Sequence, residues 1–215
     1  MPPMAERRER KKQETRQRIS DVATALFFER GFEAVTVDEI AVAAKVSKMT
    51  VFNYFARKEE LLLDREDDLK LLPFRQALAQ RPAGQPPVDA LRALVAALSA
   101  DKHPLLHVNA RVVDWWRIVD DSPSLRARLR ELADEAADAL AIELAGARAG
   151  PRVRLAAGLV VLALRTAREE SVRRVRRGES AKKANAALLD VLQQGLDAAE
   201  QLLESGSAPV LPDNS

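Results

Sequence analysis

The run from Thr36 to Lys58, TVDEIAVAAKVSKMTVFNYFARK, limits the folds open to this chain more than any other feature of the sequence. Thr36 and Glu39 have the S/T-x-x-E spacing of a capping box, in which each side chain bonds a free backbone N–H at a helix start. Val35 and Ile40 occupy the two positions of a hydrophobic staple around the same point. Two signals at one place therefore predict that a helix begins at Thr36.

A second short helix is predicted to begin at Ser47, because serine is a favourable N-cap residue. Only residues 44–46 lie between the two helices, so the connection must be a tight turn. Val51 and Phe55 are four residues apart and can face a core. A polar, cationic face remains, made of Ser47, Lys48, Thr50, Asn53 and Tyr54. Such a helix can enter the major groove of DNA, but an ordinary helical hairpin with a solvated face fits the spacing about equally well.

The longer segment TVDEIAVAAKVSKMTVFNYFARKEELL resembles the N-terminal signature of the TetR family of bacterial transcription regulators. The resemblance extends over about residues 12–65. The positions that match the family pattern, in order and without gaps, are Thr36, Ile40, Ala41, Ala44, Val46, Ser47, Thr50, Val51, Phe52, Tyr54, Phe55, Lys58, Glu59 and Leu61.

Three residues depart from that pattern. Lys45 stands where the family usually has glycine, and a left-handed backbone there would cost about 1 kcal/mol. Met49 replaces a second common glycine at the exposed start of the second helix, where it could touch a thymine methyl group. Arg57 replaces the usual cap residue before the next helix, so we expect that helix to lack a side-chain cap.

The resemblance implies an all-α fold of about nine helices, with a three-helix helix-turn-helix head and a larger helical domain. It also implies which residues bind DNA. Base contacts are expected from Lys48, Met49, Thr50 and Asn53. Contacts on or near the DNA backbone are expected from Thr36, Ser47, Phe52, Tyr54 and Lys58.

Four segments are expected along the chain. They are a disordered basic arm at 1–12, a helix-turn-helix DNA-binding domain at 13–57, a helical effector-binding and dimerisation domain at 58–204, and a disordered tail at 205–215. The basic arm could follow DNA phosphates, dip into the minor groove or remain solvated. Residues 58–80 read as one helix with a kink or break near Leu72, because Pro73 removes a backbone donor and clashes with the preceding turn.

Composition argues against an enzyme. The chain has no cysteine, which excludes disulfides, thiol catalysis and cysteine-ligated metals. It has no Gly-rich phosphate loop and no nucleophile elbow. His103 and His107 are separated by Pro104 and lack an E-x-x-H pattern. We therefore expect no catalytic residue, no cofactor and no metal site.

Charge and hydropathy constrain location and partners. The net charge is only +2, so any affinity for nucleic acid must come from local patches. No apolar run approaches the ~20 residues of a membrane span. The N-terminus is charged and has no apolar stretch typical of a secretory signal. We therefore expect a cytoplasmic protein with no membrane partner.

The last two predicted helices, 152–177 and 180–203, contain more apolar residues than one covered face requires. An ordinary core would account for them. The family resemblance implies instead a homodimer, in which both helices pair with their copies in a four-helix bundle. Its two-fold symmetry would present two recognition helices about 34–36 Å apart to a palindromic operator.

In the TetR family the helices between the head and the dimer interface enclose a pocket for a small-molecule effector. The candidates here are Val112, Trp115, Trp116, Leu162 and Arg165. A large aromatic side chain near a buried cation would suit an amphipathic anion, such as an acyl thioester or a hydrophobic acid. Core packing explains either tryptophan taken alone.

The resulting hypothesis is a sequence-specific, ligand-responsive repressor without enzyme activity. The free dimer would bind a palindromic operator, and a small hydrophobic or amphipathic effector would release it by favouring a second state. The alternative is a small-molecule-binding helical dimer whose head has lost specific DNA binding, which the departures at Lys45 and Met49 make conceivable.

Overall fold

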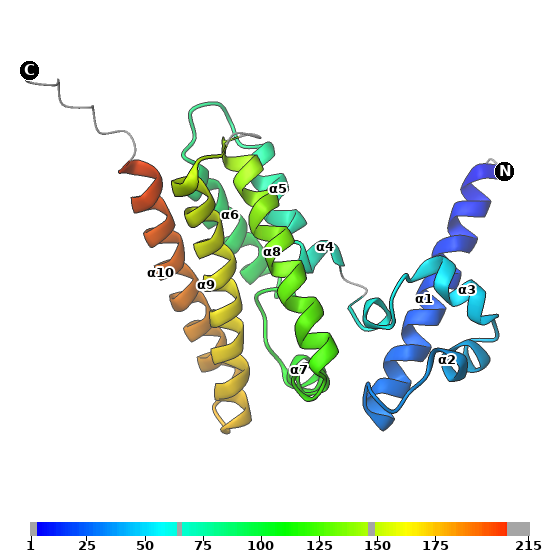
Figure 1. Ribbon diagram of the computed structural model, residues 1–215. Helices are drawn as coiled ribbons and strands as arrows, with labels where there is room; N and C mark the ends of the chain where they lie inside the picture. Colours follow the sequence, from blue (N-terminus) through cyan, green and yellow to red (C-terminus); the bar gives the residue numbers. More distant parts are fainter. Residues whose placement is uncertain (1–3, 64–65, 146–148, 206–215) are drawn as a thin grey trace, which may run out of the picture. The chain divides into compact units, whose positions relative to one another are not determined.

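The computed structural model shows an all-helical protein (Figure 1). It describes residues 4–63, 66–145 and 149–205. Within these ranges there are ten α-helices, one 3-10 helix and no strand. The all-α fold predicted from the sequence is therefore confirmed. No helix in the described ranges combines the length and the apolar character that crossing a membrane would require.

The chain forms two compact units, and they do not follow the order of the sequence. The first contains the N-terminal helices together with residues 114–128. The second contains residues 67–113 and the chain from 129 onward. Residues 114–128 belong to the first unit although they are distant from it in sequence, and such a long-range association leaves no local signal.

The first unit contains four N-terminal elements, α1 (Met4–Arg30), α2 (Val37–Ala43), α3 (Lys48–Tyr54) and the 3-10 helix η1 (Lys58–Leu61). Its core is made of apolar side chains that are almost fully buried, among them Ile19, Phe27, Val35, Ile40, Val51 and Phe55. These residues come from α1, α2, α3 and the adjoining loops, so the helix-turn-helix pair packs on α1.

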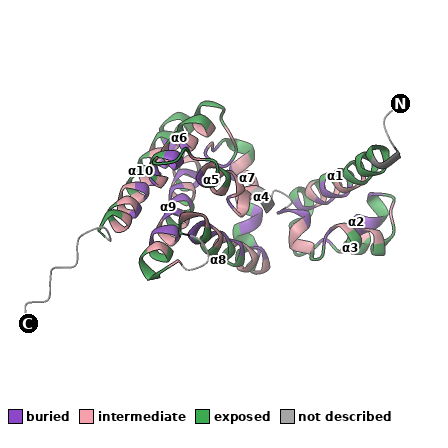
Figure 2. Ribbon diagram, turned by 90° about the horizontal axis from the view of Figure 1, so that it is seen from above, coloured by how far each residue is buried: buried purple, intermediate pink, exposed green. Residues whose placement is uncertain are grey.

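The expectation of a disordered arm at 1–12 is wrong for residues 4–12, which are the first turns of α1. Arginine, lysine and glutamate are good helix formers, and Arg10 forms an i,i+4 ion pair with Glu14 at 3.3 Å. The side chains from residue 6 to residue 14 are all exposed (Figure 2). The other predicted disordered segment, 205–215, lies outside the described residues except for Ser205.

The helix expected over 58–80 is divided into three. After η1 come α4 (Glu66–Leu69) and α5 (Leu72–Ala79). Leu71 has a left-handed φ of 53°, which ends one element before the next begins. Pro73 is the second residue of α5 and not a kink inside a longer helix, a position at which proline costs no backbone hydrogen bond.

The remaining helices complete the chain: α6 (Pro87–Ala100), α7 (Ala110–Asp121), α8 (Pro123–Ala145), α9 (Pro151–Arg176) and α10 (Ala181–Glu204). In the second unit α9 and α10 lie side by side along most of their lengths (Figure 1). Gly195 on α10 permits this close approach. A Cβ atom built there would lie only 2.0 Å from the Cβ atom of Ala163 on α9.

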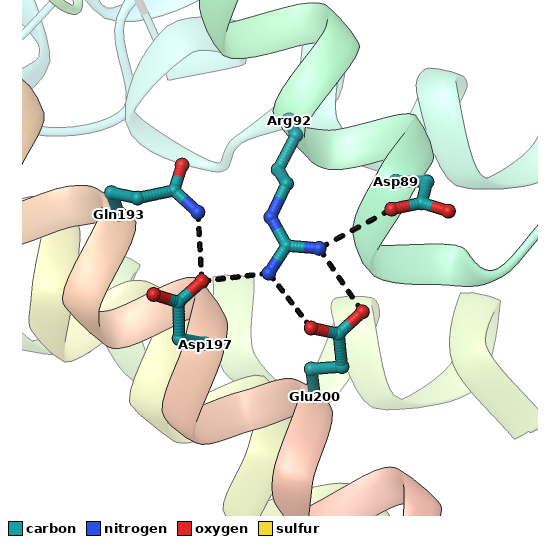
Figure 3. A network of polar contacts seen from close by, with 5 residues as sticks. All are labelled: Asp89, Arg92, Gln193, Asp197 and Glu200. Carbon is teal, nitrogen blue, oxygen red and sulfur yellow. Dashed lines mark hydrogen bonds and ion pairs between the residues drawn. The ribbon is translucent and has the colours of Figure 1, made fainter.

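A polar network joins α6 to α10 (Figure 3). The Arg92 guanidinium donates to both carboxylate oxygens of Glu200, at 3.0 and 2.7 Å, and to Asp197 Oδ1 at 2.6 Å. It also donates to Asp89 Oδ1 at 3.2 Å, and Gln193 donates to Asp197 Oδ1 at 2.7 Å. These carboxylates hold the pKa of Arg92 above its ordinary value. Because Arg92 bridges two helices, the network sets the position of α6 along α10.

Candidate nucleic-acid interface

The start of α2 is held by the predicted capping box, which the structure confirms. The backbone N–H of Thr36 donates to Glu39 Oε2 at 2.7 Å, and the backbone N–H of Glu39 donates to Thr36 Oγ1 at 3.2 Å. Glu39 also forms an ion pair with Arg30 at 2.8 Å. Since Arg30 is the last residue of α1, Glu39 links the end of α1 to the start of α2.

This arrangement makes Glu39 a source of acid sensitivity. Hydrogen bonds from the backbone and side chain of Thr36, and then from Arg30, lower the pKa of Glu39 from 4.5 to about 2. A carboxylate with a lowered pKa in the folded state stabilises the protein above pH 4.5, and this contribution is lost as the pH falls toward 2. Unfolding measured between pH 5 and pH 2 should therefore depend less steeply on pH in Glu39→Gln than in the wild type. Glu29→Gln, on the exposed side of α1, is the matched control; equal slopes for wild type and Glu39→Gln would contradict this assignment.

The turn between α2 and α3 is closed by backbone hydrogen bonds. The N–H of Ala44 donates to the carbonyl of Ile40 at 2.8 Å, and that of Val46 donates to the carbonyl of Ala41 at 2.9 Å. Lys45 adopts a left-handed φ of 55°. Lysine therefore occupies the conformation that favours glycine, at a cost of about 1 kcal/mol, and the turn keeps its shape.

Helix α3 has a buried side and an exposed side. Ser47 caps it, with the N–H of Thr50 donating to Ser47 Oγ at 3.0 Å. Val51 and Phe55 are both 1% exposed and point into the core of the first unit. The opposite side carries exposed residues, Ser47, Lys48, Met49, Phe52 and Asn53, with Thr50 and Tyr54 half-buried at its edges.

Most residues expected to touch DNA thus lie on one outer face of α3. Met49 is 69% exposed and Phe52 is 43% exposed, so both apolar side chains are open to a partner. Lys48 Nζ pairs with Asp38 Oδ2 at 2.8 Å, and both side chains are solvent-exposed. Exposed pairs of this kind contribute little to stability, so Lys48 can exchange Asp38 for another anion at small cost.

Lys58, which was expected to contact the DNA backbone, makes contacts within the head in this structure. Its Nζ donates to the carbonyl oxygen of Phe32 at 2.6 Å and lies 4.3 Å from the centroid of the Phe32 ring. Burial lowers the pKa of Lys58. In this structure Lys58 fastens the loop between α1 and α2, and a contact of Lys58 with phosphate stays a prediction.

Comparison with known proteins agrees with this geometry. The family model described as "Bacterial regulatory proteins, tetR family" matches residues 19–64, which include α2, the turn and α3. Residues 19–64 belong to the TetR family. Among TetR-family relatives, the HTH-type transcriptional regulator TcmR of Streptomyces glaucescens is 39% identical over 84 residues, which are 39% of this chain and 37% of TcmR. The uncharacterized HTH-type transcriptional regulator YdeS of Bacillus subtilis (strain 168) is 44% identical over 50 residues, which are 23% of this chain and 25% of YdeS.

The matches to these curated relatives thus span little more than a third of their length at most. Both are named as transcriptional regulators, and neither is named as an enzyme.

Solved structures extend the likeness to the whole fold. The complex of SmeT with triclosan shares 21% identity and a TM-score of 0.57, over 86% of this chain and 90% of SmeT. NalD, the secondary repressor of a Pseudomonas aeruginosa efflux pump, shares 18% identity and a TM-score of 0.54, over 86% of this chain and 97% of NalD. At such low identity these structures show the TetR fold alone.

Two polar contacts in this TetR-family head were not predicted from the sequence. The first is Arg16 on α1, whose Nη1 donates to the carbonyl oxygen of Tyr54 at 2.7 Å. Its guanidinium also lies 4.4 Å from the centroid of the Phe55 ring. A cation at the C-terminal end of α3 is favourable, because that end carries free carbonyl groups and a partial negative charge. Arg16 and Tyr54 are 38 residues apart, so no local feature of the sequence relates them.

The second contact joins the α7–α8 corner to the loop between α1 and α2. Ser122 Oγ donates to Glu33 Oε1 at 2.5 Å and accepts from the N–H of Leu125 at 3.3 Å. Ser122 is 1% exposed, and it therefore caps α8 and holds Glu33 at the same time. The cap was predictable from the Ser-Pro sequence, whereas the partner 89 residues away was not.

Replacing Ser122 with Ala should lower the free energy of unfolding by about 1–2 kcal/mol, because the change removes a helix cap and a buried hydrogen bond. Urea unfolding followed by circular dichroism measures this loss. Ser99→Ala on α6 removes a half-buried hydroxyl that caps no helix start, and it should leave the midpoint nearly unchanged. Equal midpoints for the two variants would show that Ser122 has no such role.

The candidate effector residues differ in their exposure to solvent. Trp115 and Trp116 are half-buried and pack edge to face, with ring centroids 5.0 Å apart and an interplanar angle of 84°. Val112 is half-buried as well. Leu162, by contrast, is 45% exposed, and Arg165 is exposed with its Nε 3.8 Å from Glu169 Oε1.

The expectation of a buried cation at Arg165 is therefore wrong. Arg168, three residues further along α9 and about 60° away around the helix, is half-buried. Desolvation lowers the pKa of Arg168 to about 10, although the nearby charges of Asp68 and Glu169 act in the opposite direction.

Proposed function

We propose that this TetR-family protein is a sequence-specific DNA-binding transcriptional regulator that acts in the cytoplasm as a repressor. The observation that carries the proposal is the exposed face of α3, in which a helix held by a cap at Ser47 presents polar, cationic and flexible apolar side chains outward. Lys48, Met49, Thr50 and Asn53 would contact base edges in the major groove. Thr36, Ser47, Phe52, Tyr54 and Lys58 would contact the DNA backbone or support those that do.

The proposed active form is a homodimer formed through α9 and α10. One protomer leaves apolar side chains exposed on α9, with Leu155 at 56% and Leu162 at 45%. These two residues are seven apart and therefore share a helix face, on which Leu159 is half-buried. A second copy of the chain would cover this strip, and its two-fold symmetry would suit a palindromic operator.

The proposed regulator responds to a small hydrophobic or amphipathic effector. The half-buried aromatic pair Trp115 and Trp116, with Val112 on the same helix, supports this proposal. Leu162 and Arg165 are weaker candidates, since both are exposed on α9. Among the structural relatives, SmeT is known as a complex with triclosan. An acyl thioester or a hydrophobic acid is the ligand class we propose to test first.

Selection of bound fragments from random duplex DNA at moderate salt, followed by a gel shift on the enriched sequence, tests the proposed function. We expect a palindromic motif that is bound with a Kd in the nanomolar range, as is typical of specific regulators. Decanoate and decanoyl-CoA added to that complex then test whether an effector releases the DNA. No enriched motif, together with only weak and salt-sensitive binding, would instead support a ligand-binding dimer whose head no longer reads DNA.

A further inference from the structure

The N-terminal turns of α1 form an exposed helix that extends past α3 in the first unit (Figures 1 and 2). Arg16 marks the point at which this helix meets the recognition helix, because its guanidinium donates to the carbonyl oxygen of Tyr54 at 2.7 Å. From Arg16 toward the N-terminus, Lys12 and Arg8 follow in steps of four residues. Both are exposed.

Residues four apart lie on nearly the same face of an α-helix, about 6 Å apart along its axis. Arg8, Lys12 and Arg16 therefore form a cationic row about 12 Å long that begins at the C-terminal end of α3. Glu9 is the one acidic residue that borders this row, so the row keeps a net positive charge. On another side of the helix, Arg10 is paired with Glu14 at 3.3 Å.

We propose that the cationic row, made of Arg8, Lys12 and Arg16, binds phosphates of duplex DNA beside the major groove that α3 enters. This inference rests on the proposed function of the head and extends its contact surface beyond the helix-turn-helix. Phosphate neutralisation by lysine and arginine supplies most non-specific affinity for DNA. With a net charge of only +2 on the whole chain, that affinity depends on local rows of this kind.

Because this segment is helical, its width determines whether it can enter the minor groove of DNA or can only contact the phosphate backbone. An α-helix with its side chains is about 10–12 Å wide, whereas the minor groove is about 6 Å wide. The row therefore follows the phosphate backbone and does not enter the minor groove. It should increase affinity for all sequences to a similar extent and add no base preference.

The salt dependence of DNA binding tests this proposal. Arg8→Gln/Lys12→Gln removes two charges from the row, and Arg7→Gln/Arg18→Gln removes two charges from the opposite face of the same helix. Glutamine is a good helix former, and circular dichroism verifies that both variants keep their helix content. Arg16 is left unchanged because of its contact with α3.

For a dimer, the row variant loses four phosphate contacts, which should reduce the slope of log K against log salt by about 3.6. Raising the salt from 50 to 200 mM weakens DNA binding of both proteins, but the loss of affinity should be about a hundredfold smaller in the row variant than in the wild type. The slope for the control variant, Arg7→Gln/Arg18→Gln, should differ from the wild-type slope by no more than about one. Equal slopes for the two variants would contradict the proposal that the cationic row binds DNA phosphates.

The same titration on a duplex without the selected site keeps the two proposals apart, because phosphates are present in every sequence. Failure to enrich a specific motif overturns the proposed function alone. A slope difference on both specific and non-specific duplex supports the row, and a difference confined to the specific site overturns it as a phosphate-binding surface.

Discussion

Gly195→Ala should lower the free energy of unfolding by about 3 kcal/mol, at the upper end of the usual cost of overpacking a core. The added Cβ atom would lie 2.0 Å from the Cβ atom of Ala163 and 3.4 Å from its Cα atom. Carbon atoms normally approach to about 3.5–4.0 Å. Ala163 has no flexible side chain that could move aside, so α9 and α10 would have to separate.

Urea unfolding of wild type and variant measures this effect. Gly158→Ala is the matched control on α9, since a Cβ atom there meets nothing within 4 Å. In a helix interior that change should stabilise the protein by about 0.5–1 kcal/mol. Adding Ala163→Gly to Gly195→Ala should recover part of the loss by restoring space. Wild-type stability in Gly195→Ala would show that α9 and α10 do not pack as closely as described.

Asn53→Ala should weaken specific DNA binding about a hundredfold while leaving the fold intact. Asn53 is exposed on α3 between the buried residues Val51 and Phe55, so its truncation does not disturb the core. An asparagine that bonds a base edge with two hydrogen bonds contributes about 1–3 kcal/mol of discrimination. A dimer would lose this contribution twice.

Gel shifts on the selected operator and on an unrelated duplex measure this change. Affinity for the operator should fall, whereas affinity for the unrelated duplex should stay the same, because Asn53 carries no charge. Gln76→Ala, an exposed amide on α5 in the second unit, should affect neither. Unchanged operator affinity in Asn53→Ala would remove Asn53 from the set of base-contacting residues.

The parts of the interface that the sequence predicted are those governed by neighbouring residues. The capping box of Thr36 and Glu39 and the cap at Ser47 both depend on contacts within a few positions. The alternation of buried Val51 and Phe55 with exposed Asn53 follows from helix geometry once the helix start is known.

The parts that the sequence did not predict depend on long-range contacts or on helix phase. Ser122 and Glu33 are 89 residues apart, and nothing local relates them. Arg16 reads as one more cation in a basic segment until α3 is placed beside it. Arg165 and Arg168 are both cations on α9, and only the packing of this helix determines that Arg165 is exposed and Arg168 half-buried.

The spacing of the two half-sites tests whether a dimer recognises a palindrome with two copies of α3. Five base pairs inserted between the half-sites of the selected operator rotate one of them to the opposite side of the duplex, since half-sites must be about one helical turn of 10–10.5 base pairs apart. We expect affinity to fall at least a hundredfold, toward that of a single half-site, whereas the same insertion outside the operator should have no effect. Unchanged affinity after the internal insertion would contradict simultaneous recognition of two half-sites by one dimer.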